Sequence, residues 1–286
     1  GFYNRQEKCP GNVTKLQFCP HVTSARTAGK CASECRQQDG CVGFVRDPIT
    51  EECRLCDTPI ADDCSNTEPS STMESFEQAE GYGDGVYWIL PTMTTQPFRV
   101  TCEMQYERTF VMIRRDKILS FYRDWIEYRE GFGDMAGDHW LGLKHIWELT
   151  NSRAYELIFE VFLLNGEWFQ QSYRNFVVTD ESENFSMSFK GTDSYARPLG
   201  DSLSDVNGSP FSTYDADHDN DVNINCAERH HSGWWFGGVN CTECNPTGVL
   251  LQPADMSRTG DPREVFWSRN LGNIVPNVVY AWLQRW

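Results

Sequence analysis

The sequence lacks an apolar run of about 20 residues, the length that a membrane-spanning helix requires. It also lacks internal repeats, low-complexity tracts, and collagen-like or coiled-coil segments. Basic residues are scarce: 25 Lys and Arg stand against 41 Asp and Glu, which gives a net charge of −16. Nucleic acids and anionic membranes bind to basic faces, so we expect neither nucleic-acid binding nor membrane insertion.

Catalytic and zinc-binding motifs are absent as well. The chain has no G-x-S-x-G sequence to carry a nucleophile. A reaction at His230 or His231 beside the neighbouring aspartates is conceivable, but those aspartates better suit a cation, so we predict no enzyme activity. Two C-x-x-C pairs, Cys53–Cys56 and Cys241–Cys244, lie too far apart in sequence for a zinc ribbon.

The twelve cysteines therefore indicate disulfides and an oxidising compartment. The chain begins Gly1-Phe2-Tyr3 without Met or an apolar leader, as expected of the mature product of a secretory precursor. Glycosylation sequons agree with a secreted, extracellular protein; they begin at Asn12, Asn184, Asn207 and Asn240.

The segment that precedes Cys226 has an aspartate at every second position, from Asp215 to Asp221. A buried strand is excluded there, because several unpaired carboxylates would have to leave water. The alternative is a solvated acidic turn. Alternate side-chain oxygens on a disulfide-held loop also suit calcium, which takes six to eight oxygen ligands from side chains, carbonyls and water. We favour calcium.

Cysteine density divides the chain. Seven cysteines lie in residues 9–56, and small modules depend on disulfides because their cores are small, so residues 1–60 form a separate predicted unit. The pattern there predicts a helix over 28–38 and strands over 41–45 and 51–55. In residues 61–286, we expect a loop over 65–85, strands over 86–89, 109–113 and 154–164, and a helix over 144–149.

Motifs spread over the second unit resemble the fibrinogen C-terminal-like domain, and the ordered matches span most of it. They are Gly85-Val-Tyr-Trp-Ile-Leu-Pro91, Phe98-Arg-Val-Thr-Cys-Glu-Met104, Ile113-Arg-Arg115, Phe121-Tyr-Arg-Asp-Trp125, Tyr128-Arg-Glu-Gly-Phe-Gly133, His139-Trp-Leu-Gly-Leu143, Tyr155-Glu-Leu157, Phe211-Ser-Thr213, Asn225-Cys-Ala227 and Gly233-Trp-Trp235.

The first unit has a shorter match. The run Cys31-x3-Cys35-x5-Cys41-Val-Gly-Phe44, followed by Cys53, resembles a PAN/apple module. Together the resemblances imply an α+β chain, with a small disulfide-rich module followed by a domain built on a twisted antiparallel sheet. They imply the disulfides Cys64–Cys102, Cys226–Cys241 and Cys35–Cys41, and a bond from Cys31 to Cys53 or Cys56.

The resemblance also implies a calcium loop, from which this chain departs. Its aspartate loop is one residue longer before Cys226 than is usual in the family. The family's calcium ligands can therefore be matched to this chain in two registers that differ by one residue. We expect Asp217 and Asp219 as side-chain ligands, with Asp221 and a carbonyl near Asn223 as further ligands. The loop from Cys226 to Cys241 is two residues longer, which should reshape the pocket rim.

Lectin members of the family, the ficolins and tachylectins, bind acetyl groups beside this loop, at backbone N–H groups around a cis peptide. The resemblance places that peptide at Asn240–Cys241. A wall of aromatic and polar side chains suits a small neutral ligand. The implied ligand-binding residues are His230, His231, Trp235, Asn240, Cys241, Thr242 and Arg258.

Each of these residues also has a purely structural interpretation. Trp234 is expected in the core, and Trp235 could pack there too or line the pocket. His230 and His231 are expected to be exposed loop residues. Arg258 is a surface residue that, if it binds ligand, suits a carboxylate such as that of sialic acid.

Cys244 stands where the family has no cysteine, and the seven earlier cysteines leave one unpaired. We expect Cys244 to bridge the two units or two chains, and a disulfide-linked homo-oligomer could then raise avidity. We predict a secreted lectin for N-acetylated or sialylated glycans, with a role in innate recognition. The alternative is an adhesion or matrix protein that binds protein partners without sugar recognition.

Overall fold

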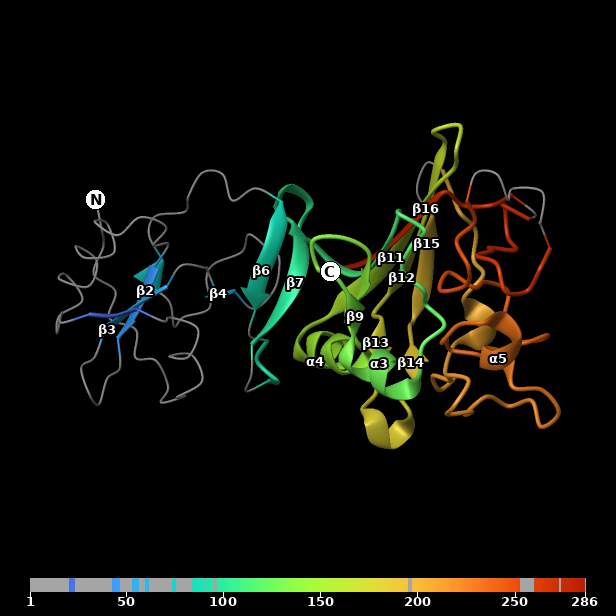
Figure 1. The fold of residues 1–286 in the computed structure, drawn as a ribbon, viewed down its shortest axis with the longest axis horizontal. Coiled ribbons are helices and arrows are strands. Elements are labelled where there is room, and N and C mark those ends of the chain that lie inside the picture. Colours follow the sequence, from blue (N-terminus) through green and yellow to red (C-terminus); the bar gives the residue numbers. More distant parts are fainter. Residues whose placement is uncertain are drawn as a thin grey trace. The chain divides into compact units, whose positions relative to one another are not determined.

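The computed structural model describes residues 21–23, 43–46, 53–56, 60–61, 74–75, 84–89, 91–94, 97–194, 197–252, 260–272 and 274–285. The chain separates into two compact units, Gly1–Arg108 and Thr109–Trp286 (Figure 1). The predicted boundary after residue 60 stays a prediction. None of the described helices is long and apolar enough to cross a membrane.

The first unit contains two groups of strands. One is a four-stranded sheet in the order β1-β3-β2-β5, in which all described pairs are antiparallel. In the other, β6 pairs with β7 antiparallel and with β4 in parallel. The strands are β1 (His21–Thr23), β2 (Gly43–Arg46), β3 (Cys53–Cys56), β4 (Ile60–Ala61), β5 (Glu74–Ser75), β6 (Gly85–Ile89) and β7 (Phe98–Glu103).

The neighbouring strands expected near residues 41–45 and 51–55 are thus present as β2 and β3. The helix expected over 28–38 and the bonds Cys31–Cys53/56 and Cys35–Cys41 involve residues outside the described ranges, so the PAN/apple resemblance stays a prediction. Cys102 on β7 is disulfide-bonded. Its expected partner, Cys64, also lies outside the described residues.

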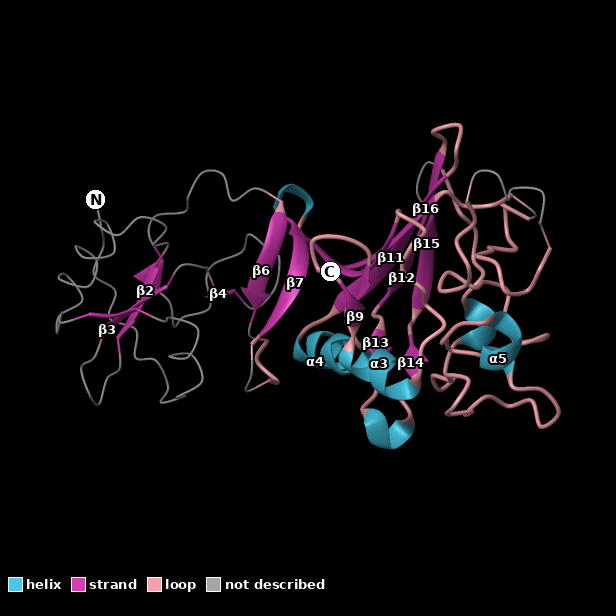
Figure 2. Ribbon diagram, in the orientation of Figure 1, coloured by secondary structure: helices cyan, strands magenta, loops and turns pink. Residues whose placement is uncertain are grey.

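The second unit is built on a sheet in the order β15-β12-β11-β16-β8, and Figure 2 labels its strands β15, β12, β11 and β16. β10 pairs with both β8 and β9. The strands of this sheet are β8 (Arg108–Arg114), β9 (Phe132–Gly133), β10 (His139–Trp140), β11 (Tyr155–Phe162), β12 (Trp168–Arg174), β15 (Gly191–Ser194) and β16 (Val278–Arg285). A separate pair joins β13 (Val177–Val178) to β14 (Met187–Ser188).

Short helices flank this sheet. The helix α3 (Trp125–Glu130) begins with a capping box, in which Asp124 and Glu127 satisfy each other's backbone N–H groups. The helix α4 (Leu143–Ser152) buries Leu143, Ile146 and Leu149 along one face. The remaining helices of this unit are η2 (Glu181–Glu183), η3 (Ser204–Val206) and α5 (Cys226–His230), while η1 (Met104–Tyr106) belongs to the first unit. The antiparallel α+β architecture is confirmed, and the predicted strands over 86–89, 109–113 and 154–164 and the helix over 144–149 are present as β6, β8, β11 and α4. The predicted loop over 65–85 is not a loop throughout, because β5 lies within it.

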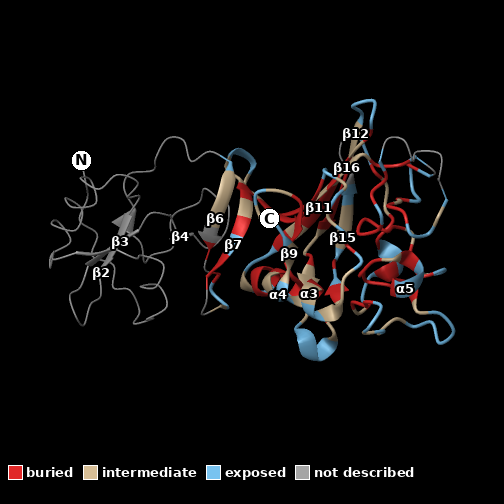
Figure 3. Ribbon diagram, viewed as in Figure 1, coloured by how far each residue is buried: buried red, intermediate tan, exposed pale blue. Residues whose placement is uncertain are grey.

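Buried residues, drawn red in Figure 3, occur both on the strands of the sheet and in the C-terminal loops. The largest fully buried side chains of the described residues are all aromatic. Trp234 and Trp235 pack against each other with ring centroids 5.0 Å apart, and both are almost fully buried. Trp235 donates its indole N–H to the Phe185 carbonyl at 2.8 Å. The two interpretations of Trp235 are thereby resolved: it is a core residue, as Trp234 is.

Candidate functional site

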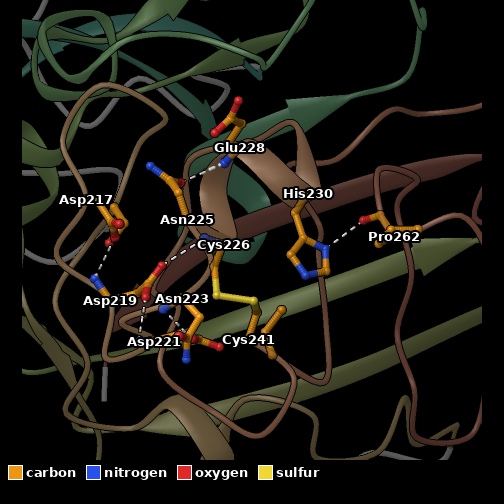
Figure 4. Close-up of a disulfide and its surroundings, with 12 residues drawn as sticks. Asp217, Asp219, Asp221, Asn223, Asn225, Cys226, Glu228, His230, Cys241 and Pro262 are labelled. Carbon is orange, nitrogen blue, oxygen red and sulfur yellow. Dashed lines mark hydrogen bonds between the residues drawn. A yellow bond between two sulfur atoms is a disulfide. The ribbon is translucent and has the colours of Figure 1, made fainter.

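The site is organised by the disulfide between Cys226 and Cys241, whose Cα atoms lie 5.6 Å apart (Figure 4). Cys226 is the first residue of α5, and the side chain of Asn225 caps that helix by accepting the Glu228 N–H at 2.8 Å. The predicted Cys226–Cys241 bond is therefore confirmed. It fastens a turn around Asn240 to the start of the helix.

Directly before α5, the acidic loop folds through its own carboxylates. Asp217 accepts the N–H of Asp219 at 3.2 Å, and Asp219 accepts that of Asp221 at 2.8 Å. Asp221 in turn accepts the N–H of Asn223 at 3.0 Å. The alternation seen in the sequence thus produces repeated side-chain-to-backbone turns that curl the loop (Figure 4).

Asp219 also connects this loop to the helix. Its second carboxylate oxygen accepts the Cys226 N–H at 2.8 Å. Burial raises the pKa of Asp217, and the nearby charge of Asp219 adds to the effect. Two carboxylates this close repel each other, and a divalent cation between them would relieve the repulsion.

The available donor atoms are hard oxygens, which fit calcium. Among the described residues, no three His, Cys, Asp or Glu side chains converge as a metal cluster. A cation held at Asp217 and Asp219 would therefore take its remaining ligands from backbone carbonyls, amides such as Asn223, or water.

His230 is buried, with 3% of its surface exposed, so the expectation of an exposed loop residue is wrong. Its Nδ1 lies 2.7 Å from the Pro262 carbonyl, and its ring stacks on Phe236 with centroids 5.3 Å apart. Burial lowers the pKa of His230. The Pro262 contact comes from a segment 32 residues away, which the local sequence does not reveal.

Because Nδ1 donates to Pro262, the neutral ring carries its lone pair on Nε2. That atom is buried and makes no hydrogen bond, although the Asn240 carbonyl lies near it. A carbonyl cannot donate to a lone pair, so Nε2 is an unsatisfied acceptor beside the Asn240–Cys241 turn.

This turn differs from the expected one. Asn240 and Cys241 have positive φ angles of 54° and 78°, and no cis peptide occurs among the described residues, so the expected cis bond is wrong. The Cys241 N–H donates to the Gly238 carbonyl at 3.2 Å, while Gly237 and Gly238 both donate to the Cys241 carbonyl. In this folded-back turn the Cys241 N–H, a donor expected to bind ligand, is already hydrogen-bonded.

The other predicted residues occupy different environments. Thr242 is buried, and its hydroxyl bonds the backbone of Cys244. His231 ends α5 with a left-handed φ of 47° and stacks on Tyr122. Asn240 is exposed. Arg258 lies outside the described residues and stays a prediction.

Cys244 is a free thiol and is fully buried, so the predicted inter-domain or inter-chain bridge is wrong. Burial raises the pKa of the thiol well above its ordinary value. The sulfur lies near the Trp234 indole, inside the core rather than at the surface. It therefore acts as a small apolar residue and offers no bond for a disulfide-linked oligomer.

Two further features were missed from the sequence. Asn245, which is completely buried, uses its amide to contact the carbonyls of His230, Pro262 and Glu264. The second is a group of exposed aromatic rings around Tyr122 and Tyr214. Nothing in the local pattern marks either one, because each depends on contacts between segments far apart in the chain.

Comparison with known proteins agrees with the antiparallel fold. Residues 71–275 match the family described as fibrinogen beta and gamma chains, C-terminal globular domain. Mouse angiopoietin-4 is 34% identical over 190 residues, which are 65% of this chain and 35% of that protein. Mouse fibrinogen C domain-containing protein 1 is 36% identical over 182 residues, 61% of this chain and 38% of that protein.

Solved structures lead to the same conclusion. The fibrinogen-like globe domain of human ANGPTL6 has a TM-score of 0.66 and 28% identity, covering 80% of this chain and 98% of that one. Lamprey fibrin D-dimer, complexed with the peptide Gly-His-Arg-Pro-amide, has a TM-score of 0.64 and 25% identity, covering 72% and 70%.

The chain spans well under half the length of the curated relatives it matches. The fibrinogen-like relatives are not enzymes, in agreement with the prediction of no covalent chemistry. With the family model covering most of the chain, the protein belongs to the family of fibrinogen C-terminal globular domains.

Proposed function

We propose that this protein is a secreted, calcium-organised recognition protein that binds N-acetylated glycans beside the Asn240–Cys241 turn. The observation that carries the proposal is the buried, unsatisfied Nε2 of His230. A buried acceptor without a partner is costly, and a ligand that supplies an N–H or O–H group would remove that cost. An acetamido group and a sugar hydroxyl both supply such donors.

Calcium acts in this proposal through the connections of the acidic loop. Asp217 and Asp219 hold the ion, and the second oxygen of Asp219 fixes the start of α5. The disulfide then carries this restraint to Cys241. Losing calcium would loosen the turn that faces His230. Sialylated glycans would additionally require a partner for their carboxylate, and Arg258 is our candidate.

A glycan array, run with calcium and again with a chelator, tests the proposal. The informative variant is His230→Asn, because the asparagine amide can still donate to the Pro262 carbonyl while Nε2 is removed. We expect binding to N-acetylated glycans to weaken about three- to ten-fold, the effect of losing one neutral hydrogen bond. His145→Asn, which changes a half-buried histidine on α4 beside Glu148, is the matched control and should bind as the unaltered chain does.

Thermal unfolding of both variants separates a lost contact from a lost fold. If His230→Asn melts at the same temperature and binds glycans unchanged, Nε2 is not the recognition group. If the array shows no glycan binding in either condition, the lectin proposal is refuted.

A protein partner is the second candidate function. The observation that favours it is the Cys241 N–H, which already donates to Gly238 and must be released before it can bind an acetyl oxygen. The structure of the related lamprey fibrin with a bound peptide supports peptide recognition in this family. Capture of a defined protein ligand by a chain that is silent on the glycan array would favour this function.

A further inference from the structure

Three rings form an exposed stack on the second unit, outside the turn around His230. We call Tyr122, Tyr214 and His231 the aromatic platform. Tyr122 lies between the other two, with its ring centroid 4.6 Å from His231 at an interplanar angle of 16° and 4.8 Å from Tyr214. Tyr122 is 37% exposed and Tyr214 is 41% exposed. Isolated exposed apolar residues are ordinary, but a contiguous group of rings indicates a binding surface.

The backbone holds these rings in place. Tyr122 lies just before the capping box of α3. Asp215, the neighbour of Tyr214, accepts the Trp125 N–H at 3.0 Å and the Thr213 hydroxyl at 2.7 Å, which ties Tyr214 to the same helix. His231 is fixed by its left-handed C-cap position at the end of α5. The platform is therefore preorganised, and binding would cost little ordering entropy.

Carboxylates surround the aromatic platform. Burial raises the pKa of Tyr122, and the charge of Glu228 on α5 raises it further. Partial burial raises the pKa of Tyr214, with contributions from the charges of Asp215 and Asp124. The charge contributions place Glu228 near Tyr122 and Asp215 near Tyr214, and among the described residues neither carboxylate forms an ion pair with a cation.

Two basic side chains lie close in sequence to the aromatic platform: Arg229, which is exposed on α5 next to Glu228, and Arg123, which is already engaged. The Arg123 guanidinium bonds Glu127 at 2.7 Å and lies over the Phe132 ring at 5.5 Å. It therefore offsets the charge of Glu127. Asp215 keeps its negative charge although one of its oxygens accepts two hydrogen bonds, and Glu228 lies exposed on α5. Electron-rich rings bordered by carboxylates attract a cation, since the ring face and the charge act in the same direction.

We infer that the aromatic platform binds an arginine-bearing segment of a protein partner. A planar guanidinium can lie flat on Tyr122 or Tyr214 and donate hydrogen bonds sideways to a carboxylate such as Glu228. Lysine would offer only a point charge, so arginine is preferred. The net charge of −16 steers a basic segment toward the chain in the same way.

This surface is distinct from the proposed glycan site. The ring of His230 is enclosed by Phe236 and Pro262, whereas His231, one residue later, stacks on Tyr122 at the surface. The inference does not depend on sugar binding, and a lectin and a non-lectin could both carry the platform.

The experiment measures fluorescence anisotropy of a labelled peptide with two arginines separated by glycine, titrated with the full chain at low salt and at physiological salt. The comparison peptide replaces arginine with citrulline, which has the same shape and no charge. Tyr214→Leu removes the ring and retains apolar area, and Glu228→Gln removes the charge. Glu167→Gln, in the β11–β12 hairpin, makes the same change in net charge elsewhere.

We expect the arginine peptide to bind and the citrulline peptide not to bind. Tyr214→Leu and Glu228→Gln should each weaken arginine binding about two- to five-fold, as for one exposed cation–π or ion contact, while Glu167→Gln leaves it unchanged. Circular dichroism melting confirms that each variant is folded.

Equal weakening by Glu228→Gln and Glu167→Gln would mean that only the overall charge matters, and it would overturn the inference. Equal binding of the citrulline peptide would also overturn it. If Tyr214→Leu lost glycan binding and kept arginine binding, the platform would be a sugar-stacking surface instead. The His230→Asn array result is independent of these outcomes, so the two proposals can fail separately.

Discussion

The buried amide of Asn245 should be one of the most sensitive positions in the second unit. Its Oδ1 accepts the Ser232 hydroxyl at 2.8 Å, and its Nδ2 points at the carbonyls of His230, Pro262 and Glu264 at 3.2, 3.3 and 3.4 Å. The amide has two hydrogens for these three acceptors, so two or three effective hydrogen bonds are at stake. The residue is 0% exposed, and water cannot replace them.

Asn245→Ala removes these bonds together. Each is worth about 0.5–1.5 kcal/mol, and stranded buried groups add to the loss, so we expect the free energy of unfolding to fall by about 2–4 kcal/mol. Asn245→Asp has the same shape but points a carboxylate at the three carbonyls. At neutral pH it should therefore destabilise the fold at least as much as alanine does.

Urea unfolding followed by tryptophan fluorescence measures the change, with calcium present and disulfides intact. Asn165→Ala is the matched control, because Asn165 makes its contacts in an exposed turn with Glu167 and should lose less than about 1 kcal/mol. If Asn245→Ala costs no more than this control, or if Asn245→Asp is milder than alanine at neutral pH, the hydrogen-bond argument is refuted.

Two further predictions concern the acidic loop and a pH effect. Calcium at a hundred times its dissociation constant should raise the free energy of unfolding by about 2.7 kcal/mol. Asp219→Asn should abolish that increase, whereas the control Asp193→Asn on β15 should keep it. If calorimetry shows the same calcium response in Asp219→Asn as in the unaltered chain, Asp219 is not a ligand. Burial, and to a lesser extent the charge of Glu243, raises the pKa of Asp205 from its ordinary 3.8 to about 6. The stability that this carboxyl contributes is therefore fully present below about pH 3.8 and is lost as the pH rises through about 6. The amide introduced by Asp205→Asn can still accept the Glu243 N–H. Compared with the unaltered chain, Asp205→Asn should therefore be more stabilising at pH 7.5 than at pH 4.5, by up to about 1 kcal/mol because the group is partly exposed. Urea midpoints whose difference between the two proteins does not change with pH would contradict this.

Local sequence predicted the parts of this molecule that depend on local physics. Alternating apolar residues in β11 and the apolar face of α4 follow periodicities set by the backbone itself. The spaced aspartates excluded a buried strand, and the structure has an irregular loop there. The family resemblance supplied the Cys226–Cys241 bond, which the structure contains.

Two of the errors concern burial that the local sequence does not reveal. His230 was expected at the surface, but the Pro262 carbonyl, 32 residues away in sequence, and the Phe236 ring enclose it. Cys244 was expected to form a bridge because a count of cysteines carries no information about the core in which the thiol lies. The third error is local: the turn at Cys241 has no cis peptide, and the backbone of Gly237 and Gly238 bonds to Cys241 instead.

The position of β16 within the sheet has a consequence for how the chain acquires its structure. Residues 278–285 pair along their whole length with β11, from Tyr155 opposite Arg285 to Phe162 opposite Val278. β16 lies between β11 and β8 in the sheet order. During synthesis, β8 and β11 leave the ribosome long before their shared neighbour does, so their edges stay unpaired in the meantime. Such late, long-range pairing makes folding slow and favours chaperone protection of those edges, and a chain shortened within β16 would lose the middle of its sheet rather than an end.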